Sequence, residues 1–348
     1  MKQAQNSGSR SNNLQVNNLV VNNAGLSYAD ARLIALDVFR SELNTLAGQA
    51  AQTAWERVES ITDKFLLELQ KQNPNGFSKA NDPGFQYALH ALQTEYVKTG
   101  DDDLGDVLVG LLVDHTKQER RSLIQIVLAE CLTTVPKLTP DQINSLALLF
   151  YFRNVKGLSI DSLSDLAGNI DRYIRPFVSS YAQSDVSFQY MQFCGCGAST
   201  PLVGIALESI LLQKYPGLLT NGFDRAHIDG LGLSVSCDHP LFIKCLNNPS
   251  NLQVRAIDLG VLEQRFTEYA LPSHEHEKIK ELMNLNMLTP EEVNGKMSEL
   301  LSYWSSLSVN WNKGGFKAFD LTSVGMAIGH ASIKRNSQKM ADLNIWIK

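Results

Sequence analysis

Residues 27–72 have the sequence SYADARLIALDVFRSELNTLAGQAAQTAWERVESITDKFLLELQKQ, and this stretch decides the expected fold. Ser27 is a residue type that caps helix N-termini, and Asp30 can return the hydrogen bond and interact favourably with the helix dipole. No proline interrupts the stretch, and Gly48 is its only glycine. The pattern therefore predicts one long helix over residues 27–72.

Apolar residues recur along this helix at steps of three and four, which is the spacing of a coiled-coil seam. A straight helix of this length would run about 70 Å at 1.5 Å per residue, which is longer than a compact domain requires. The seam must pack on later helices of the chain or on a second copy, unless the helix bends or breaks at Gly48. The seam residues that we assign to self-association are Leu36, Phe39, Leu43, Leu46, Ala50 and Ala54.

A duplicated five-residue unit precedes the helix, with NLQVN at 13–17 and NLVVN at 18–22. Its β-branched residues favour a strand, and its asparagines can form ladders between identical strands. Two such units need a partner sheet, because isolated strand pairs are marginal in water. We predict that the partner is the same segment of other subunits, so that the protein is a homo-oligomer. The residues that would make this contact are Leu14, Val16, Leu19 and Val21.

The rest of the chain predicts a mainly α fold with a smaller α+β part at its C-terminal end. Two capping boxes, Thr139 with Gln142 and Thr289 with Glu292, are predicted to start two of the later helices. Turn signals and helix caps together place helices near 84–99, 103–115, 117–134, 140–155, 160–168, 169–182, 200–214, 240–246, 259–270, 274–286, 290–306 and 322–334. Strands are expected near 231–235, 252–257, 316–321 and 343–348, the last of them paired inside the fold. The expected division is an N-terminal strand segment at 1–26, a long helix at 27–72, a helical domain at 73–183 and an α+β domain at 184–348.

Composition excludes several classes of protein. The formal net charge of −5 gives no overall attraction to nucleic acid or to an anionic membrane. The N-terminus has no apolar signal region, and the apolar runs are far shorter than the roughly 20 residues that span a membrane. Five cysteines in 348 residues are typical of reduced thiols. We therefore expect a cytoplasmic protein that contacts no membrane and is not a nucleic-acid binder.

Cys194 and Cys196 form a C-x-C pair, and Cys237 and His239 form a C-x-H pair. These are ligand types that a tetrahedral zinc site accepts, but their spacing is not one of the usual frames. The glycines that flank Cys196 fit a tight turn equally well, with the thiols filling small buried gaps. We predict packed thiols, with no metal and no cofactor.

The segment Cys194–Thr200 also offers an alternative function. Cys196 lies shortly before an expected helix N-terminus, where the helix dipole would lower the thiol pKa and favour a nucleophile. The sequence identifies no general base, and Ser199 does not lie in a G-x-S-x-G turn. We predict no catalytic residue and keep an enzyme built on this segment as the alternative.

A second alternative concerns residues 282–343, whose order of elements loosely resembles a winged-helix module. The helix that would read DNA has no lysine or arginine between Lys296 and Lys313. Contacts with bases and phosphates depend on such side chains. The alternative is therefore a binding module that contacts a protein partner.

Three stretches of the chain carry a resemblance when taken together: GLSYADARLIALDVFRSEL at 25–43, ERRSLIQIVLAECLTTVPKLTPDQINSLALLFYFRN at 119–154 and FCGCGASTPLVGIALESILLQKYPGLL at 193–219. Together they resemble an uncharacterised bacterial family. The first also resembles segments that precede different domains in bacterial conflict and defence proteins. The resemblance brings no catalytic motif to this chain, so the expected function is a non-enzymatic, self-associating scaffold or sensor, in bacterial antiphage defence.

Overall fold

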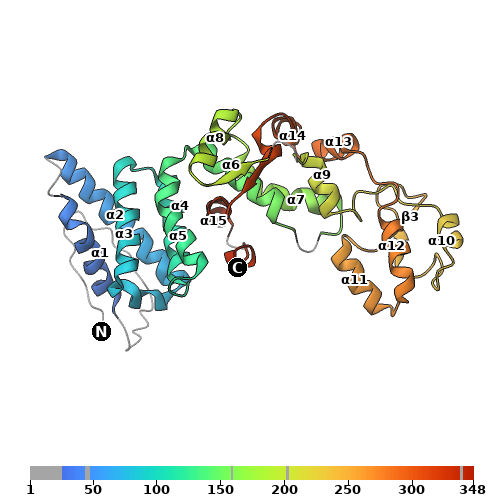
Figure 1. Cartoon of the computed structure of the whole chain (residues 1–348), viewed down its shortest axis with the longest axis horizontal. Helices are drawn as coiled ribbons and strands as arrows, with labels where there is room; N and C mark the ends of the chain where they lie inside the picture. Colours follow the sequence, from blue (N-terminus) through green and yellow to red (C-terminus); the bar gives the residue numbers. More distant parts are fainter. Residues whose placement is uncertain (1–25, 44–47, 158–159, 201–203, 338–339) are drawn as a thin grey trace, which may run out of the picture.

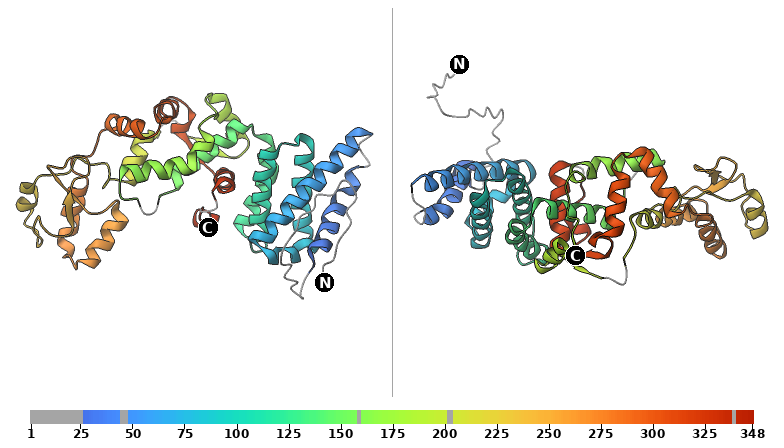
Figure 2. Two further views of the ribbon diagram at one scale, coloured as in Figure 1. Left: turned by 180° about the vertical axis from the view of Figure 1, so that it is seen from behind. Right: turned by 90° about the horizontal axis from the view of Figure 1, so that it is seen from above.

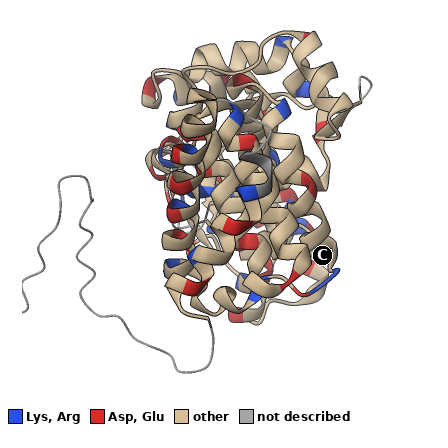
Figure 3. Ribbon diagram, turned by 90° about the vertical axis from the view of Figure 1, so that its left-hand side faces the viewer, with Lys and Arg blue, Asp and Glu red and all other residues tan. Residues whose placement is uncertain are grey.

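The computed structural model describes residues 26–43, 48–157, 160–200, 204–337 and 340–348, and it is mainly helical. The molecule is elongated, with an N-terminal bundle, a central part and a distal lobe following one another along its long axis (Figures 1 and 2). Seen from the N-terminal end, basic and acidic residues are interspersed over the helices (Figure 3). None of the described helices is long and apolar enough to cross a membrane.

The N-terminal bundle is a row of helices that lie side by side (Figure 1). Asp82 and Asp101 cap two of these helices by accepting backbone N–H bonds, as short polar side chains at N-caps do. The helices are α1 (Tyr28–Leu43), α2 (Gln49–Gln72), α3 (Pro83–Thr99), α4 (Asp102–Thr116) and α5 (Leu123–Thr134), with a 3₁₀ helix at Pro74–Asn81.

The single long helix predicted over residues 27–72 is wrong, because α1 and α2 pack against each other as a hairpin. Arg32 of α1 pairs with Asp63 of α2, with 3.1 Å between Nη2 and Oδ2. Gly48, just before α2, has φ 56° and ψ −128°, a conformation that glycine adopts without the steric cost of a side chain. The alternative of a break at Gly48 is therefore the one that the structure supports.

The predicted seam is occupied inside this hairpin. Leu36 and Phe39 of α1 are buried in one cluster with Val58 of α2. Ala54 is buried as well, whereas Ala50 is exposed. These contacts replace the intermolecular coiled coil predicted for the seam. The side chains of Leu43 and Leu46 and the segment 13–22 lie outside the described residues.

The central part is built around α15, which packs along α6 and also contacts α4 and α5 of the bundle. Gly329 allows the close approach to α6, since a Cβ there would lie 2.5 Å from the carbonyl oxygen of Leu146. The predicted capping box of Thr139 and Gln142 starts α6. The helices here are α6 (Pro140–Asn154), α7 (Leu163–Ile174), α8 (Asp185–Phe193), α9 (Leu207–Lys214), α13 (Pro290–Leu300), α14 (Trp304–Lys313) and α15 (Ser323–Asn336).

The winged-helix resemblance of residues 282–343 does not hold. Strand β4 (Phe319–Leu321) pairs in antiparallel fashion with β1 (Gly197–Ser199), far away in the sequence, rather than forming a wing. The helix that follows, α15, lies in the main hydrophobic core. This C-terminal region is therefore part of the central body and not a separate module.

Residues 222–285 form the lobe, which has a hydrophobic cluster of its own. The chain enters and leaves it through two segments that pair side by side, and we call these segments, 217–221 and 286–288, the neck. The amide of Asn221 donates to the carbonyl of Asn286, and that of Leu288 donates to Leu219, both at 2.8 Å. The elements of the lobe are α10 (Arg225–Leu231), β2 (Phe242–Lys244), β3 (Leu252–Val254), α11 (Leu259–Glu268) and α12 (His276–Met283).

The hydrophobic clusters divide the chain differently from the predicted domain layout. The main core runs from Ala31 to Ile347 and crosses the predicted boundary at residue 184 without a break. In place of the α+β domain expected at 184–348, the described residues of this region contain two pairs of three-residue strands among helices. Strand β2 replaces the helix predicted near 240–246, because its pairing with β3 outweighs local preference.

The predicted C-terminal strand is a 3₁₀ turn, Leu343–Ile345, and it packs inside the fold. Leu343 and Ile347 are buried in the main core. The indole N–H of Trp346 donates to the carbonyl of Asn154 at 3.0 Å, at the end of α6. Burial of the segment is therefore achieved by side-chain packing rather than by strand pairing.

Candidate ligand-binding cleft

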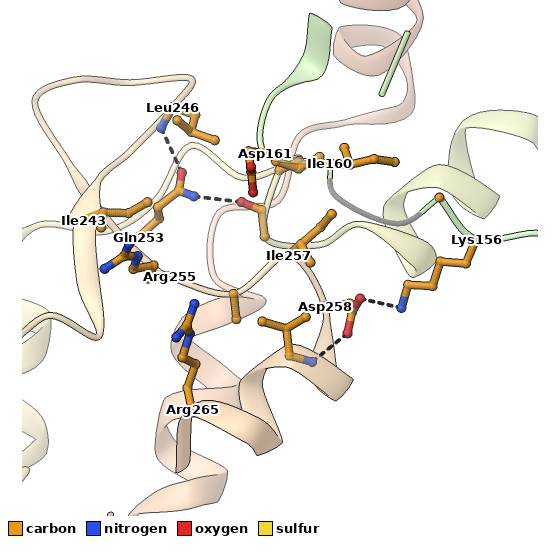
Figure 4. A pocket seen from close by; sticks show the side chains of 15 residues that line it. Lys156, Ile160, Asp161, Ile243, Leu246, Gln253, Arg255, Ile257, Asp258 and Arg265 are labelled. Atoms are coloured by element: carbon orange, nitrogen blue, oxygen red, sulfur yellow. Dashed lines mark hydrogen bonds and ion pairs between the residues drawn. The ribbon is translucent and has the colours of Figure 1, made fainter. Parts of the chain in front are cut away.

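A cleft of about 340 Å³ lies where the lobe meets the central part (Figure 4). One wall comes from the segment after α6 and from the neck. The other wall comes from β2, β3, the loop after β3, and α11. The lining residues are Lys156, Gly157, Ile160, Asp161, Gly217, Leu218, Ile243, Leu246, Gln253, Arg255, Ala256, Ile257, Asp258, Val261 and Arg265.

An ion pair joins the two walls. The ammonium of Lys156, on the central part, lies 2.6 Å from Oδ2 of Asp258, on the lobe. Asp258 also caps α11 by accepting the N–H of Val261 at 2.9 Å. Burial would raise the pKa of the Asp258 carboxyl, but the hydrogen bonds from Lys156 and Val261 and the Lys156 charge outweigh it and lower the pKa. Asp258 is therefore a carboxylate held by both walls.

Gln253 fixes the lobe to the neck beneath the cleft. Its amide nitrogen donates to the carbonyl of Gly217 at 2.9 Å, and its amide oxygen accepts the N–H of Leu246 at 2.8 Å. A Cβ at position 217 would lie 1.7 Å from the carbonyl oxygen of Ala256, so only glycine fits there. These contacts hold the loop after β3 directly against the neck.

Two guanidinium groups lie on the same side of the cleft, one from Arg255 and one from Arg265 (Figure 4). Arg265 pairs with Glu268 through Nη1, while its Nε is buried without an acceptor among the described residues. Arg255 is exposed, and its guanidinium has no acceptor in the described part of the chain. The carboxylate of Asp161 lies on the opposite wall, next to Ile160.

Lys214 lies near the cleft but does not line it. Its ammonium donates to the carbonyls of Phe152 and Val155, at 2.5 and 2.6 Å, and so satisfies the C-terminal end of α6. Burial, together with the charge of Lys156, lowers the pKa of Lys214 to about 7. Two short bonds to backbone oxygens identify it as a helix cap rather than a nucleophile facing a ligand.

The structure does not bring the predicted alternative site together. Cys194 and Cys196 pack with the main core, whereas Cys237 packs with the lobe and receives a contact from Nη1 of Arg225 at 3.1 Å. The ring of His239 packs edge-on against Tyr269. Among the described residues, no three histidine, cysteine or acidic side chains are grouped so that they could hold a metal ion.

The segment Cys194–Thr200 has a structural role. Cys196 is fully buried, and burial, with a smaller effect from Cys194, raises the pKa of its thiol to about 12. The hydroxyl of Thr200 donates to Asp320 at 2.9 Å, and Arg153 pairs with the same carboxylate at 2.8 Å. These contacts pin β1 and β4 to the end of α6.

Sequence reasoning missed the cleft, because its residues come from segments far apart in the chain. Lys156 and Asp258 carry no shared motif, and each resembles an ordinary surface charge when the sequence is examined locally. The only local signal is that Asp258, a residue type that caps helices, precedes the helix predicted near 259–270, and this identifies a helix start and not a binding site.

No curated protein and no solved structure matches this chain. A model of an uncharacterised family, whose description reads only "-like" and names no activity, matches residues 25–347. The match covers both the central part and the lobe, and it confirms the expectation of an uncharacterised family. The likeness of the opening segment to defence proteins stays a prediction. Because the match spans nearly the whole sequence, the chain belongs to that uncharacterised family.

Proposed function

We propose that this protein is a non-enzymatic sensor or scaffold that self-associates through residues 13–22 and receives its signal in the cleft. The observation that carries the proposal is that the central part, the neck and the lobe together line the cleft, and that Lys156 and Asp258 form an ion pair across it. A ligand that touches both walls would favour one orientation of the lobe. The role in bacterial antiphage defence is proposed on the resemblance of residues 25–43 alone.

The non-enzymatic reading is supported by the state of the candidate nucleophiles. The thiol of Cys196 is buried with a raised pKa, and the ammonium of Lys214 is occupied by two carbonyl oxygens. A cysteine nucleophile needs thiolate character and access to substrate. Neither requirement is met at Cys196.

The proposed self-association involves fewer residues than the sequence alone predicted. The α1–α2 hairpin already fills the seam, with Leu36 and Phe39 packed on Val58. The residues proposed to hold subunits together are therefore Leu14, Val16, Leu19 and Val21. Burying each of these side chains would contribute about 1.5–3 kcal/mol before the entropy cost of ordering the segment.

Light scattering coupled to size exclusion tests the assembly. The wild type is expected to be larger than a monomer, and the double variant Val16→Asp, Val21→Asp is expected to have a smaller mass with unchanged helical circular dichroism. Val186→Asp, at an exposed position on α8, is the matched control and should keep the wild-type mass. A monomeric wild type, or a double variant of unchanged mass, contradicts the proposal.

A further inference from the structure

We propose that the cleft binds a small organic anion, whose phosphate or carboxylate group contacts Arg255 and Arg265 while its apolar part lies between the two walls. The inference rests on the proposed function, since it names the ligand class of the same cleft. It does not depend on whether the chain self-associates.

One side of the cleft carries two guanidinium groups that are not fully paired with carboxylates of the described residues. Lys156 and Asp258 neutralise each other across the cleft at 2.6 Å. Arg265 keeps one buried N–H without an acceptor, although its Nη1 pairs with Glu268. Arg255 presents a complete guanidinium on the same side (Figure 4). Guanidinium groups match carboxylate and phosphate oxygens in a planar, two-pronged geometry, so an anion held by both groups would also relieve their mutual repulsion.

The walls define the rest of the ligand. Ile160 is buried on the central part, and Ile243, Ile257 and Val261 supply apolar surface on the neighbouring wall of the lobe. A volume of about 340 Å³ is near the lower end of the range for small-molecule pockets. The cleft therefore suits a compact molecule with one apolar body rather than an extended chain.

Asp161 limits the ligand to one anionic end. Of the carboxylates that line the cleft, Asp258 is paired, and Asp161 has no cationic partner among the described residues. A second anionic group near Ile160 would face this charge and be disfavoured. A neutral or hydrogen-donating end would be tolerated there.

Calorimetric titration of the full chain with defined probes tests the inference. The probes are phenyl phosphate and benzoate, which distinguish a phosphate from a carboxylate, with inorganic phosphate and benzyl alcohol presenting the anion and the ring separately. Phenyl phosphate or benzoate should bind more tightly than either single-feature probe. Arg255→Gln combined with Arg265→Gln should weaken that binding by about tenfold or more, as expected for loss of charge-assisted hydrogen bonds.

Two further variants make the result specific. Arg225→Gln removes an exposed arginine of the lobe outside the cleft and should leave the affinity unchanged. Asp161→Asn should strengthen the binding of both anionic probes, because it removes a nearby negative charge. Equal affinity in the double arginine variant, or no binding of either anionic probe at millimolar concentration, overturns the inference. Binding by a monomeric wild type would instead contradict only the assembly proposal, and a self-associating chain without binding would contradict only the ligand class.

Discussion

Asp114 connects the N-terminal bundle to the last helix of the central part through its charge. Its carboxylate accepts from Lys334 of α15 at 2.6 and 2.8 Å and from Lys117 at 2.8 Å. Burial would raise the pKa of Asp114, but these two ammonium groups outweigh it and lower the pKa. Because the folded state holds this carboxylate in its charged form, its stabilising effect is present above the unfolded pKa of about 3.9 and is lost as pH falls through the folded value.

Lys334→Met should therefore reduce the free energy of unfolding by about 1–3 kcal/mol at neutral pH, because Asp114 stays buried with one partner fewer. The difference from the wild type should shrink as pH falls through the lowered pKa of Asp114, because the carboxyl then becomes protonated. Urea denaturation at neutral pH and in acid measures both effects. Lys98→Met, at an exposed pair with Glu95, is the control and should change little. An equal loss at both pH values would show that the Asp114 charge is not the cause.

The five thiols should differ in reactivity according to burial. Cys131 and Cys196 are buried, and desolvation raises the pKa of both thiols. Iodoacetamide near neutral pH should modify the partly exposed Cys194 and Cys237 first, as read by peptide mass spectrometry. Modification of Cys196 ahead of Cys194 in the folded protein would support the enzyme alternative instead.

At the scale of elements, the break at Gly48 makes residues 27–72 a helical hairpin instead of one continuous helix. Gly48→Ala should destabilise the protein by about 1–3 kcal/mol, because an L-residue is strained at this positive φ. The matched control is Gly110→Ala inside α4, where a Cβ meets nothing within 4 Å and helix propensity should add about 0.5–1 kcal/mol. Thermal denaturation of both variants measures the contrast. A stabilising Gly48→Ala change would favour a continuous helix.

The C-terminal 3₁₀ turn should contribute to stability although it is not a strand. Deleting residues 343–348 removes the buried Leu343 and Ile347, each worth about 1.5–3 kcal/mol, and the contact of Trp346 with Phe150, whose ring centroids are 5.0 Å apart. The melting temperature should fall clearly. Ile345→Ser, at a side chain that is 60% exposed, should leave it nearly unchanged. An unaltered melting temperature after the deletion would mean that the turn contributes nothing to the core.

For the whole molecule, the lobe should move about the neck when the ion pair across the cleft is removed. In Lys156→Met, the neck amides of Asn221 and Leu288 should exchange hydrogen faster, while amides in α4 keep their protection. Hydrogen exchange read by mass spectrometry measures both regions. Lys244→Met, at an exposed lysine of β2 outside the lining of the cleft, serves as the control. Unchanged exchange at the neck would show that its own backbone pairing, not the ion pair, fixes the lobe.

The sequence by itself determined the features that depend on neighbouring residues. The capping boxes of Thr139 with Gln142 and of Thr289 with Glu292 form as predicted, because both partners lie within one helical turn. The mainly helical class follows from the same local signals. Membership of an uncharacterised family was also visible in the residues themselves.

Only the tertiary structure decided how these helices are used. A glycine such as Gly48 is compatible both with a continuous helix and with a break between two helices. The packing of Phe39 of α1 on Val58 of α2 favours the break. Apolar and polar residues alternate in the segment 343–348 as they do in a strand. The segment nevertheless packs on the core as a 3₁₀ turn, in which the indole N–H of Trp346 donates to the carbonyl of Asn154 at the end of α6. Lys156 and Asp258 are about a hundred positions apart in the chain, and they form an ion pair only because the tertiary structure places the lobe beside the segment after α6. A cleft made of such distant residues has no local sequence signal, since its charged side chains come together only on folding.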